Sequence, residues 1–154
     1  MSLPLRTRRR GGLPRRRNST GDPATTFGQF MNGIHGSAPR SVPQLLIHVL
    51  GSDEASVAAG LQVVRNAHHG FATASTIALV IQGRAVQFLA ANSRLGDEIN
   101  TAVALPGVSV VACENSLRSV GLSVHDLGIG VSSTPAAVVF LAQSQLEGWA
   151  YVRI

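Results

Sequence analysis

The stretch Val108-Ser-Val-Val-Ala-Cys113-Glu-Asn-Ser-Leu117 decides how this chain is expected to fold. Its apolar, β-branched start is typical of a buried strand, and that run stops at Cys113, the only cysteine. In an open α/β sheet, ligands and reactive groups gather at the carboxyl ends of the strands. The free N–H groups of the following helical turn favour a thiolate, so the stretch predicts a reactive site at Cys113.

Outward from this stretch, buried apolar runs alternate with helical patterns. The expected strands are 44–51, 75–82, 108–112, 129–131 and 149–153. The expected helices are 53–67, 86–91, 94–103, 115–120 and 135–146. We expect His68-His69-Gly70 to break the first of them, and we expect Thr134 to cap the last, with Pro135 at its first position and its end at about Leu146. This alternation predicts an α/β domain with a mainly parallel five-stranded sheet and helices on both faces.

The basic charge is concentrated at one end of the chain. The first 40 residues hold eight of the 13 arginines and one acid, Asp22, whereas the remainder has five arginines against seven acids. We therefore expect residues 1–40 to be a disordered Arg/Pro/Gly-rich arm and residues 41–154 to form the domain. The arginines of the arm could bind a polyanion such as nucleic acid. We favour the alternative that the arm is a solvated tail or an over-long start assignment.

The composition narrows the class of protein. Apolar residues make up 45% of the chain and charged residues 14%, which suits a doubly covered sheet or an oligomer. A single cysteine excludes an internal disulfide framework and indicates a reducing compartment, so we expect a cytoplasmic protein. No apolar run reaches the length of a membrane span. Neither a Gly-rich phosphate loop nor a Gly-x-Ser-x-Gly elbow is found.

Five segments between about Gln44 and Ile154 occur together in an informative order. They are Leu46-Ile-His-Val-Leu-Gly-Ser-Asp-Glu54, Val64-Arg-Asn66, Val80-Ile-Gln-Gly-Arg-Ala-Val86, Val110-Val-Ala-Cys-Glu-Asn-Ser-Leu117 followed by Gly121-Leu122, and Leu146-Glu-Gly-Trp-Ala-Tyr-Val-Arg153. In this order they resemble the DsrE/DsrF-like family of sulfur-relay proteins. The resemblance covers roughly 110 of the 154 residues.

The resemblance implies a three-layer α/β/α domain with flavodoxin-like layering that assembles as homotrimers or hexamers. Proteins of this kind carry sulfane sulfur as a persulfide on a cysteine, in sulfur oxidation or tRNA thiolation. In this sequence the carrier would be Cys113. The implied partners are a sulfur donor and a sulfur acceptor protein, and no metal or organic cofactor is required.

Five other residues are candidates for the site around Cys113. His48 would be an acid/base or hydrogen-bond partner near the thiol, and Asn66 would brace a nearby loop. Asn115 and Ser116 would donate to an anion or persulfide. Glu114 is expected to raise the pKa of the neighbouring thiol.

Each of these candidates has a structural alternative. A lone cysteine is often a packed hydrophobe, and a histidine within an apolar strand is more often satisfied by the core or an interface. His68-His69 is interpreted as a helix end rather than a metal site. The rival function is a non-catalytic oligomeric module that binds a small ligand or a protein and in which Cys113 is structural.

Overall fold

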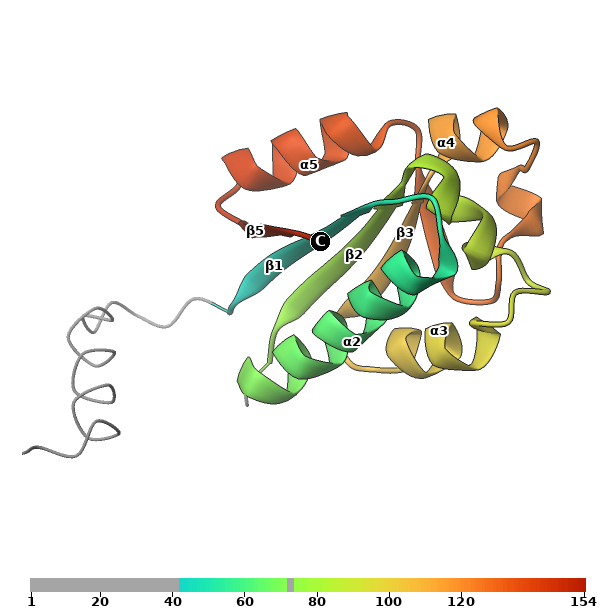
Figure 1. The fold of residues 1–154 in the computed structure, drawn as a ribbon. Coiled ribbons are helices and arrows are strands. Elements are labelled where there is room, and N and C mark those ends of the chain that lie inside the picture. Colours follow the sequence, from blue (N-terminus) through green and yellow to red (C-terminus); the bar gives the residue numbers. More distant parts are fainter. Residues whose placement is uncertain (1–41, 72–73) are drawn as a thin grey trace, which may run out of the picture. The chain divides into compact units, whose positions relative to one another are not determined.

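The computed structural model describes residues 42–71 and 74–154 (Figure 1). Its centre is a parallel sheet of five strands in the order β4-β3-β2-β1-β5. The strands are β1 (Gln44–Leu50), β2 (Thr76–Gln82), β3 (Val108–Cys113), β4 (Val131–Thr134) and β5 (Ala150–Arg153). The predicted arm, residues 1–40, lies outside the described residues.

Helices cover both faces of this sheet. They are α2 (Glu54–Phe71), the 3₁₀ helix η1 (Gly83–Leu89), α3 (Gly96–Val103), α4 (Glu114–Ser119), the 3₁₀ helix η2 (Val124–Asp126) and α5 (Ala137–Leu146). Figure 1 shows α2 and α3 on one face and α5 on the other. The predicted α/β fold with a five-stranded parallel sheet is thereby confirmed. No helix of the described part of the chain is long and apolar enough to cross a membrane.

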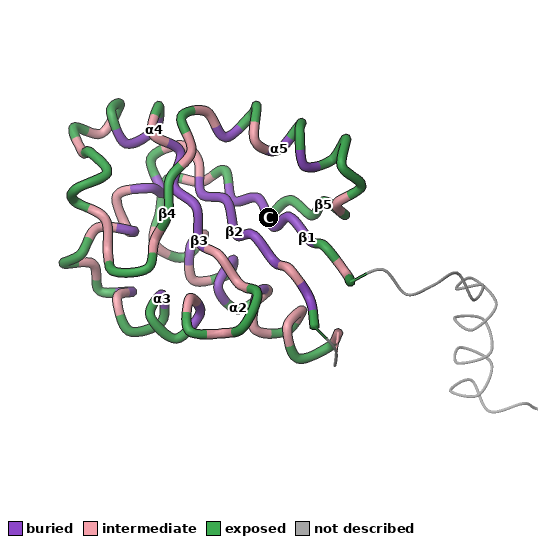
Figure 2. Tube along the Cα trace, turned by 180° about the vertical axis from the view of Figure 1, so that it is seen from behind, coloured by how far each residue is buried: buried purple, intermediate pink, exposed green. Residues whose placement is uncertain are grey.

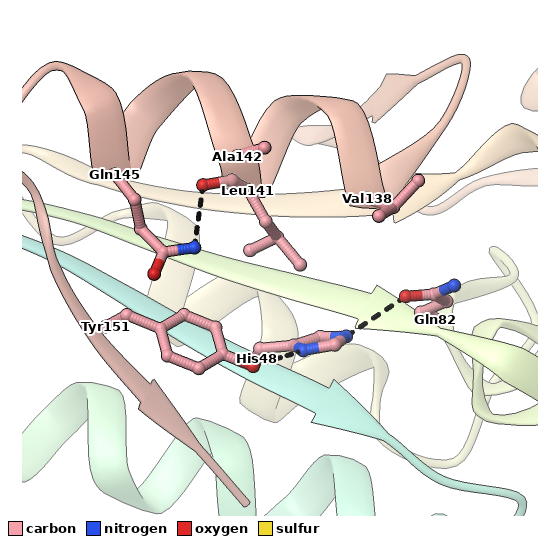
Figure 3. Close-up of a pocket in the computed structure, with 7 residues that line it drawn as sticks. All are labelled: His48, Gln82, Val138, Leu141, Ala142, Gln145 and Tyr151. Atoms are coloured by element: carbon pink, nitrogen blue, oxygen red, sulfur yellow. Dashed lines mark hydrogen bonds between the residues drawn. The ribbon is translucent and has the colours of Figure 1, made fainter.

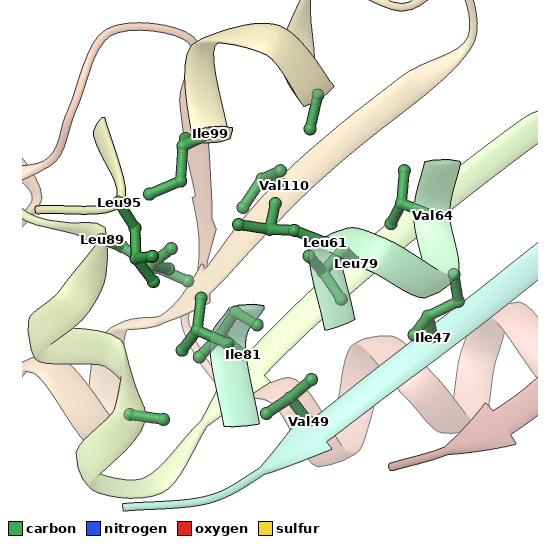
Figure 4. Packing of buried hydrophobic residues seen from close by; sticks show 14 of the residues in the cluster. Ile47, Val49, Leu61, Val64, Leu79, Ile81, Leu89, Leu95, Ile99 and Val110 are labelled. Carbon is green, nitrogen blue, oxygen red and sulfur yellow. The ribbon is translucent and has the colours of Figure 1, made fainter. Parts of the chain in front are cut away.

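The central strands are apolar on both faces because each face meets helices. The five middle residues of both β1 and β2 are buried, and Figure 2 shows the buried stretches at the centre of the sheet. The larger core lies under α2 and α3, where Leu61 and Val64 of α2 pack over Ile47 and Leu79 (Figure 4). The smaller core lies under α5 and includes Leu46, Ala78, Val80, Val111, Cys113, Ala137 and Leu141. Cys113 therefore belongs to the face that a single helix covers.

Helix α2 starts where the sequence predicts but runs further. Asp53 caps it, since Asp53 Oδ1 accepts the Ser56 N–H at 2.8 Å. The predicted break at His68 is wrong, because the helix continues to Phe71. Ala67 and Phe71 both pack against the larger core, and this apolar contact stabilises the extra turn.

Three predicted boundaries in the second half need correction. The helix expected at 86–91 is η1, which starts at Gly83 directly after β2. The strand expected at 129–131 is β4, which starts at Val131, because Gly130 has a φ of +78°, a conformation that an extended strand does not adopt. Helix α3 begins at Gly96 rather than Arg94, after the turn in which Gly96 N–H donates to Ser93 O.

The predicted start of α5 is also wrong. Thr134 does not cap the helix, because it is the last residue of β4 and pairs with Cys113. Pro135 lies outside the helix, and its carbonyl accepts the Asn115 N–H at 3.3 Å. The helix begins at Ala137 instead, and strand pairing has overridden a good local capping signal.

Candidate functional site

Cys113 lies at the carboxyl end of β3, where the sequence predicts it. Its side chain is only 2% exposed and faces α5. The Ala137 N–H at the start of α5 donates to Cys113 Sγ at 3.4 Å. The thiol is thus enclosed between the sheet and the first turns of two helices. Helix α4 directly follows Cys113 in the chain, and helix α5 packs over its side chain.

Hydrogen-bond donors around this sulfur favour its ionised form. Burial opposes ionisation, but the Ser116 hydroxyl and the backbone N–H groups of Ala137, Ser116 and Asn115 together lower the pKa of Cys113 below its ordinary value. Two of these N–H groups belong to the first turn of α4, as the sequence predicts. The third, from Ala137, comes from a segment 24 residues further along the chain. The arrangement stabilises a thiolate on a buried sulfur.

Ser116 connects the sulfur to the end of the neighbouring strand. Its side chain is buried, and its oxygen accepts the Gly83 N–H at 3.0 Å. Because that bond uses a lone pair of the hydroxyl, the O–H proton remains available for the sulfur. Ser116, predicted as an anion or persulfide donor, therefore lies at the site and is held by the first residue of η1.

Glu114 does not act on the thiol as its position in the sequence suggests. Its Oε1 accepts the Ser133 hydroxyl at 2.8 Å, and its Oε2 lies 4.0 Å from the Arg118 guanidinium. The carboxylate is directed toward β4 and along α4. The pKa of Cys113 is lowered rather than raised, so the expected effect of Glu114 is wrong.

The two predicted asparagines differ in their relation to the thiol. The Asn115 backbone N–H donates to the Pro135 carbonyl and also makes the smallest contribution to lowering the pKa of Cys113, while its side-chain Oδ1 accepts a hydrogen bond from Arg118. Asn66 is exposed on α2, which covers the opposite face of the sheet, and its Oδ1 accepts the Gln62 amide at 2.8 Å. The structure therefore separates Asn66 from the site.

His48 lies on the same face of the sheet as Cys113, at the edge of a cavity under α5 (Figure 3). Its Nδ1 is 2.8 Å from Tyr151 Oη, and its Nε2 is 3.1 Å from Gln82 Oε1. The cavity has a volume of about 310 Å³ and is lined by His48, Gln82, Val138, Leu141, Ala142, Gln145 and Tyr151. Burial lowers the pKa of His48, the Gln82 hydrogen bond opposes this, and the charge of Arg153 adds to the lowering.

The hydrogen bonds define the proton position on the neutral imidazole. Gln82 Oε1 can only accept, so Nε2 carries the proton and donates to it. Nδ1 then has a free lone pair, and the Tyr151 hydroxyl donates to it. His48 is consequently fixed on both sides, and it contacts Gln82 rather than the thiol.

Sequence reasoning missed Gln82 and Tyr151 as site residues. The alternation of Tyr151 with Ala150 and Val152 places it on one face of the last strand, a pattern that fits packing equally well. Gln82 is a polar residue that ends an otherwise apolar strand, which was the available signal. Within residues 42–71 and 74–154, no group of three or more His, Cys, Asp or Glu side chains is placed to hold a metal ion.

Comparisons with known proteins identify the fold and no function. No family model matches the sequence, and no curated protein matches it. Among solved structures, the chain is similar to MTH1491, a protein of unknown function from Methanobacterium thermoautotrophicum, with 28% identity and a TM-score of 0.67. The similarity covers 73% of this chain and 99% of MTH1491. It is also similar to BT1422, a conserved protein of unknown function from Bacteroides thetaiotaomicron, with 17% identity, a TM-score of 0.56, and coverage of 71% and 93%. The chain thus shares an α/β fold with two proteins of unknown function.

Proposed function

We propose that the protein is a sulfur carrier that holds sulfane sulfur as a persulfide on Cys113. The Cys113 thiolate attacks the outer sulfur of a donor persulfide, R–S–SH. A new S–S bond forms at Sγ, the donor S–S bond breaks, and the donor leaves as the thiolate R–S⁻. The proton stays on the transferred sulfur, and a later acceptor thiolate removes that sulfur by the same exchange, which regenerates the Cys113 thiolate.

The observation that supports this proposal is the set of donors around the sulfur. A cysteine that only fills space in a core has a raised pKa and is inert. Cys113 is buried, yet the Ser116 hydroxyl and three backbone N–H groups lower its pKa. Such an environment suits a nucleophilic thiolate and the anionic leaving sulfur of a persulfide. We also propose that the protein is cytoplasmic, because its single cysteine is a free thiol and a reducing compartment keeps such thiols unpaired.

Intact mass spectrometry tests the proposal. The purified protein is incubated with hydrogen disulfide or an organic persulfide, beside a Cys113→Ser variant. We expect a mass gain of one sulfur atom in the wild type, reversed by a reductant and absent from the variant. A wild-type protein that gains no sulfur from any donor and also resists alkylation would contradict the carrier function.

A binding module is the second candidate, and the cavity beside His48 is the observation that favours it. The cavity is of a size that small ligands occupy, and it combines an apolar wall with polar side chains. In that function Cys113 would only pack. A Cys113→Ser variant that binds, assembles and supports growth as the wild type does would favour this candidate over sulfur transfer.

We also propose that the chain assembles with itself, as homotrimers or hexamers. All four residues of β5 are exposed, and this strand pairs only with β1 among the described residues, so one side of its backbone is open for pairing. Val152 and Ile154 add apolar surface at this edge. Sedimentation velocity is expected to show a trimer or hexamer that Val152→Glu weakens; a monomeric wild type would refute the assembly.

A further inference from the structure

The cavity beside His48 comes close to Cys113 from two directions. Gln82 lines it and ends β2 next to Cys113 on β3, since the preceding residues Ile81 and Ala112 are register partners. Val138 lines it as well and directly follows Ala137, whose N–H donates to Sγ. The cavity and the sulfur therefore share the end of β2 and the first turn of α5 as their walls.

Access to the sulfur differs between large and small donors. Cys113 is 2% exposed beneath the start of α5, so a cysteine on the surface of a folded donor cannot reach Sγ while α5 is in place. The cavity opens beside that cover, and its volume of about 310 Å³ accepts a small organic molecule. The route through the cavity thus selects by size.

The lining indicates the chemistry of the occupant. Val138, Leu141 and Ala142 of α5 form an apolar wall, and Gln82, Gln145, Tyr151 and neutral His48 supply the polar groups. Among the described residues, no acidic side chain lines the cavity, and the charge of Arg153 acts on His48. An organic compound that is uncharged or anionic matches this surface.

Gln82 has a free donor at the edge of this space. Its Oε1 is bound to His48, and Figure 3 shows its amide nitrogen pointing away from that ring. Among the described residues, this nitrogen has no hydrogen-bond partner. Because Tyr151 holds His48 and His48 holds the Gln82 oxygen, the amide N–H groups are fixed at the end of β2 next to Cys113, where the thiolate of a leaving donor could accept them.

We propose that the cavity under α5 binds the sulfur donor, and that this donor is a low-molecular-weight organic persulfide rather than a persulfidated protein. The inference rests on the carrier function of Cys113. The carbon body of R–S–SH packs against α5 with its outer sulfur toward Sγ. When the S–Sγ bond forms and the donor S–S bond breaks, R–S⁻ remains in the cavity and accepts the Gln82 amide hydrogens.

The experiment compares three donors on four forms of the protein. The donors are N-acetylcysteine persulfide as the small organic donor, persulfidated serum albumin as the protein donor, and hydrogen disulfide as a donor that needs no organic pocket. The forms are the wild type, Val138→Trp and Ala142→Trp, which fill the cavity from α5, and Val139→Trp as the matched control. Val138 and Val139 are 65% and 52% exposed, and only Val138 lines the cavity. Circular dichroism and sedimentation velocity verify equal folding and assembly.

We expect N-acetylcysteine persulfide to load the wild type at least about ten-fold faster than albumin persulfide does. The two cavity-filling variants should lose about ten-fold in loading rate with the small organic donor only, because misplacing a reactant has effects of this order. Hydrogen disulfide should load all four forms within about two-fold, and Val139→Trp should match the wild type. Equal loading by albumin persulfide, or unchanged rates in both cavity-filling variants, would overturn the inference and leave the carrier function standing. Failure of all three donors on the wild type would overturn both.

Discussion

Replacing Ser116 with alanine removes one donor from the Cys113 thiolate and leaves the rest of the site in place. The Ser116 hydroxyl is the strongest of the groups that lower the pKa of Cys113. The substitution also removes the acceptor of the Gly83 N–H, 3.0 Å away. We therefore expect a higher pKa for the thiol and a small loss of stability from the unpaired N–H.

The magnitude follows from the hydrogen bond that is lost. A hydrogen bond to a charged group contributes about 1.5–3 kcal/mol, so the thiolate fraction below the pKa should fall by roughly ten-fold to a hundred-fold. A more basic thiolate is also a better nucleophile, with a Brønsted coefficient of about 0.5, which recovers about half of this effect on a logarithmic scale. The alkylation rate of Cys113 near neutral pH should therefore fall by about three- to ten-fold.

The assay is the pH dependence of iodoacetamide alkylation, read by intact mass. Ser119→Ala is the matched control, because Ser119 lies in the same helix and its hydroxyl donates to the Ser116 carbonyl at 2.7 Å rather than to the sulfur. Ser116→Ala should shift the rate profile to higher pH, and Ser119→Ala should not. Identical profiles for wild type and Ser116→Ala would refute the role of these donors.

The same substitution predicts a pH-dependent stability difference. Since the pKa of Cys113 is lowered in the folded state, its ionisation stabilises the fold above the ordinary pKa of a thiol, and this contribution is lost as the pH falls through the folded-state pKa. The gap in unfolding free energy between wild type and Ser116→Ala should therefore widen with rising pH. At low pH it should approach about 1 kcal/mol, from the unpaired Gly83 N–H alone. A gap that is constant with pH would contradict the thiolate argument.

Three further substitutions test the fold that holds the site. In urea unfolding, Gly107→Ala should destabilise the protein by at least about 3 kcal/mol, because φ is +76° and a Cβ would lie 2.0 Å from Ser75 O. Gly121→Ala is the control, because Gly121 has a φ of +77° but no atom near the added Cβ, and it should cost only about 1–2 kcal/mol. Equal losses in the two variants would show that the contact with Ser75 is relieved easily. Asp53→Ala should cost about 1 kcal/mol in the same measurement, because the Ser56 N–H loses its acceptor, and an unchanged midpoint would show that water replaces the cap.

Long-range pairing explains where the sequence-based boundaries fail. Strands β1 and β2 are predictable because burial on both faces requires continuous apolar runs. Strand β4 has only four residues, none fully buried, and its identity comes from pairing with β3. The register that joins Thr134 to Cys113 removes the cap from α5 and moves that helix start to Ala137. A local capping signal contains no information about such a partner.

The sequence by itself determined the alternation of strands and helices, the position of Cys113 at a strand end, and the N–H groups of Asn115 and Ser116 beside it, because all of these depend on neighbours along the chain. Tertiary structure decided the rest of the site. It brought in the Ala137 N–H and turned Glu114 toward Ser133.

Tertiary structure likewise joined His48 to Tyr151, 103 residues later, and to Gln82, and so formed the cavity under α5. The physical reason is that hydrogen-bond geometry and charge depend on distances in space. Residues far apart in the sequence come within those distances only after the strands have paired and α5 has packed on the sheet.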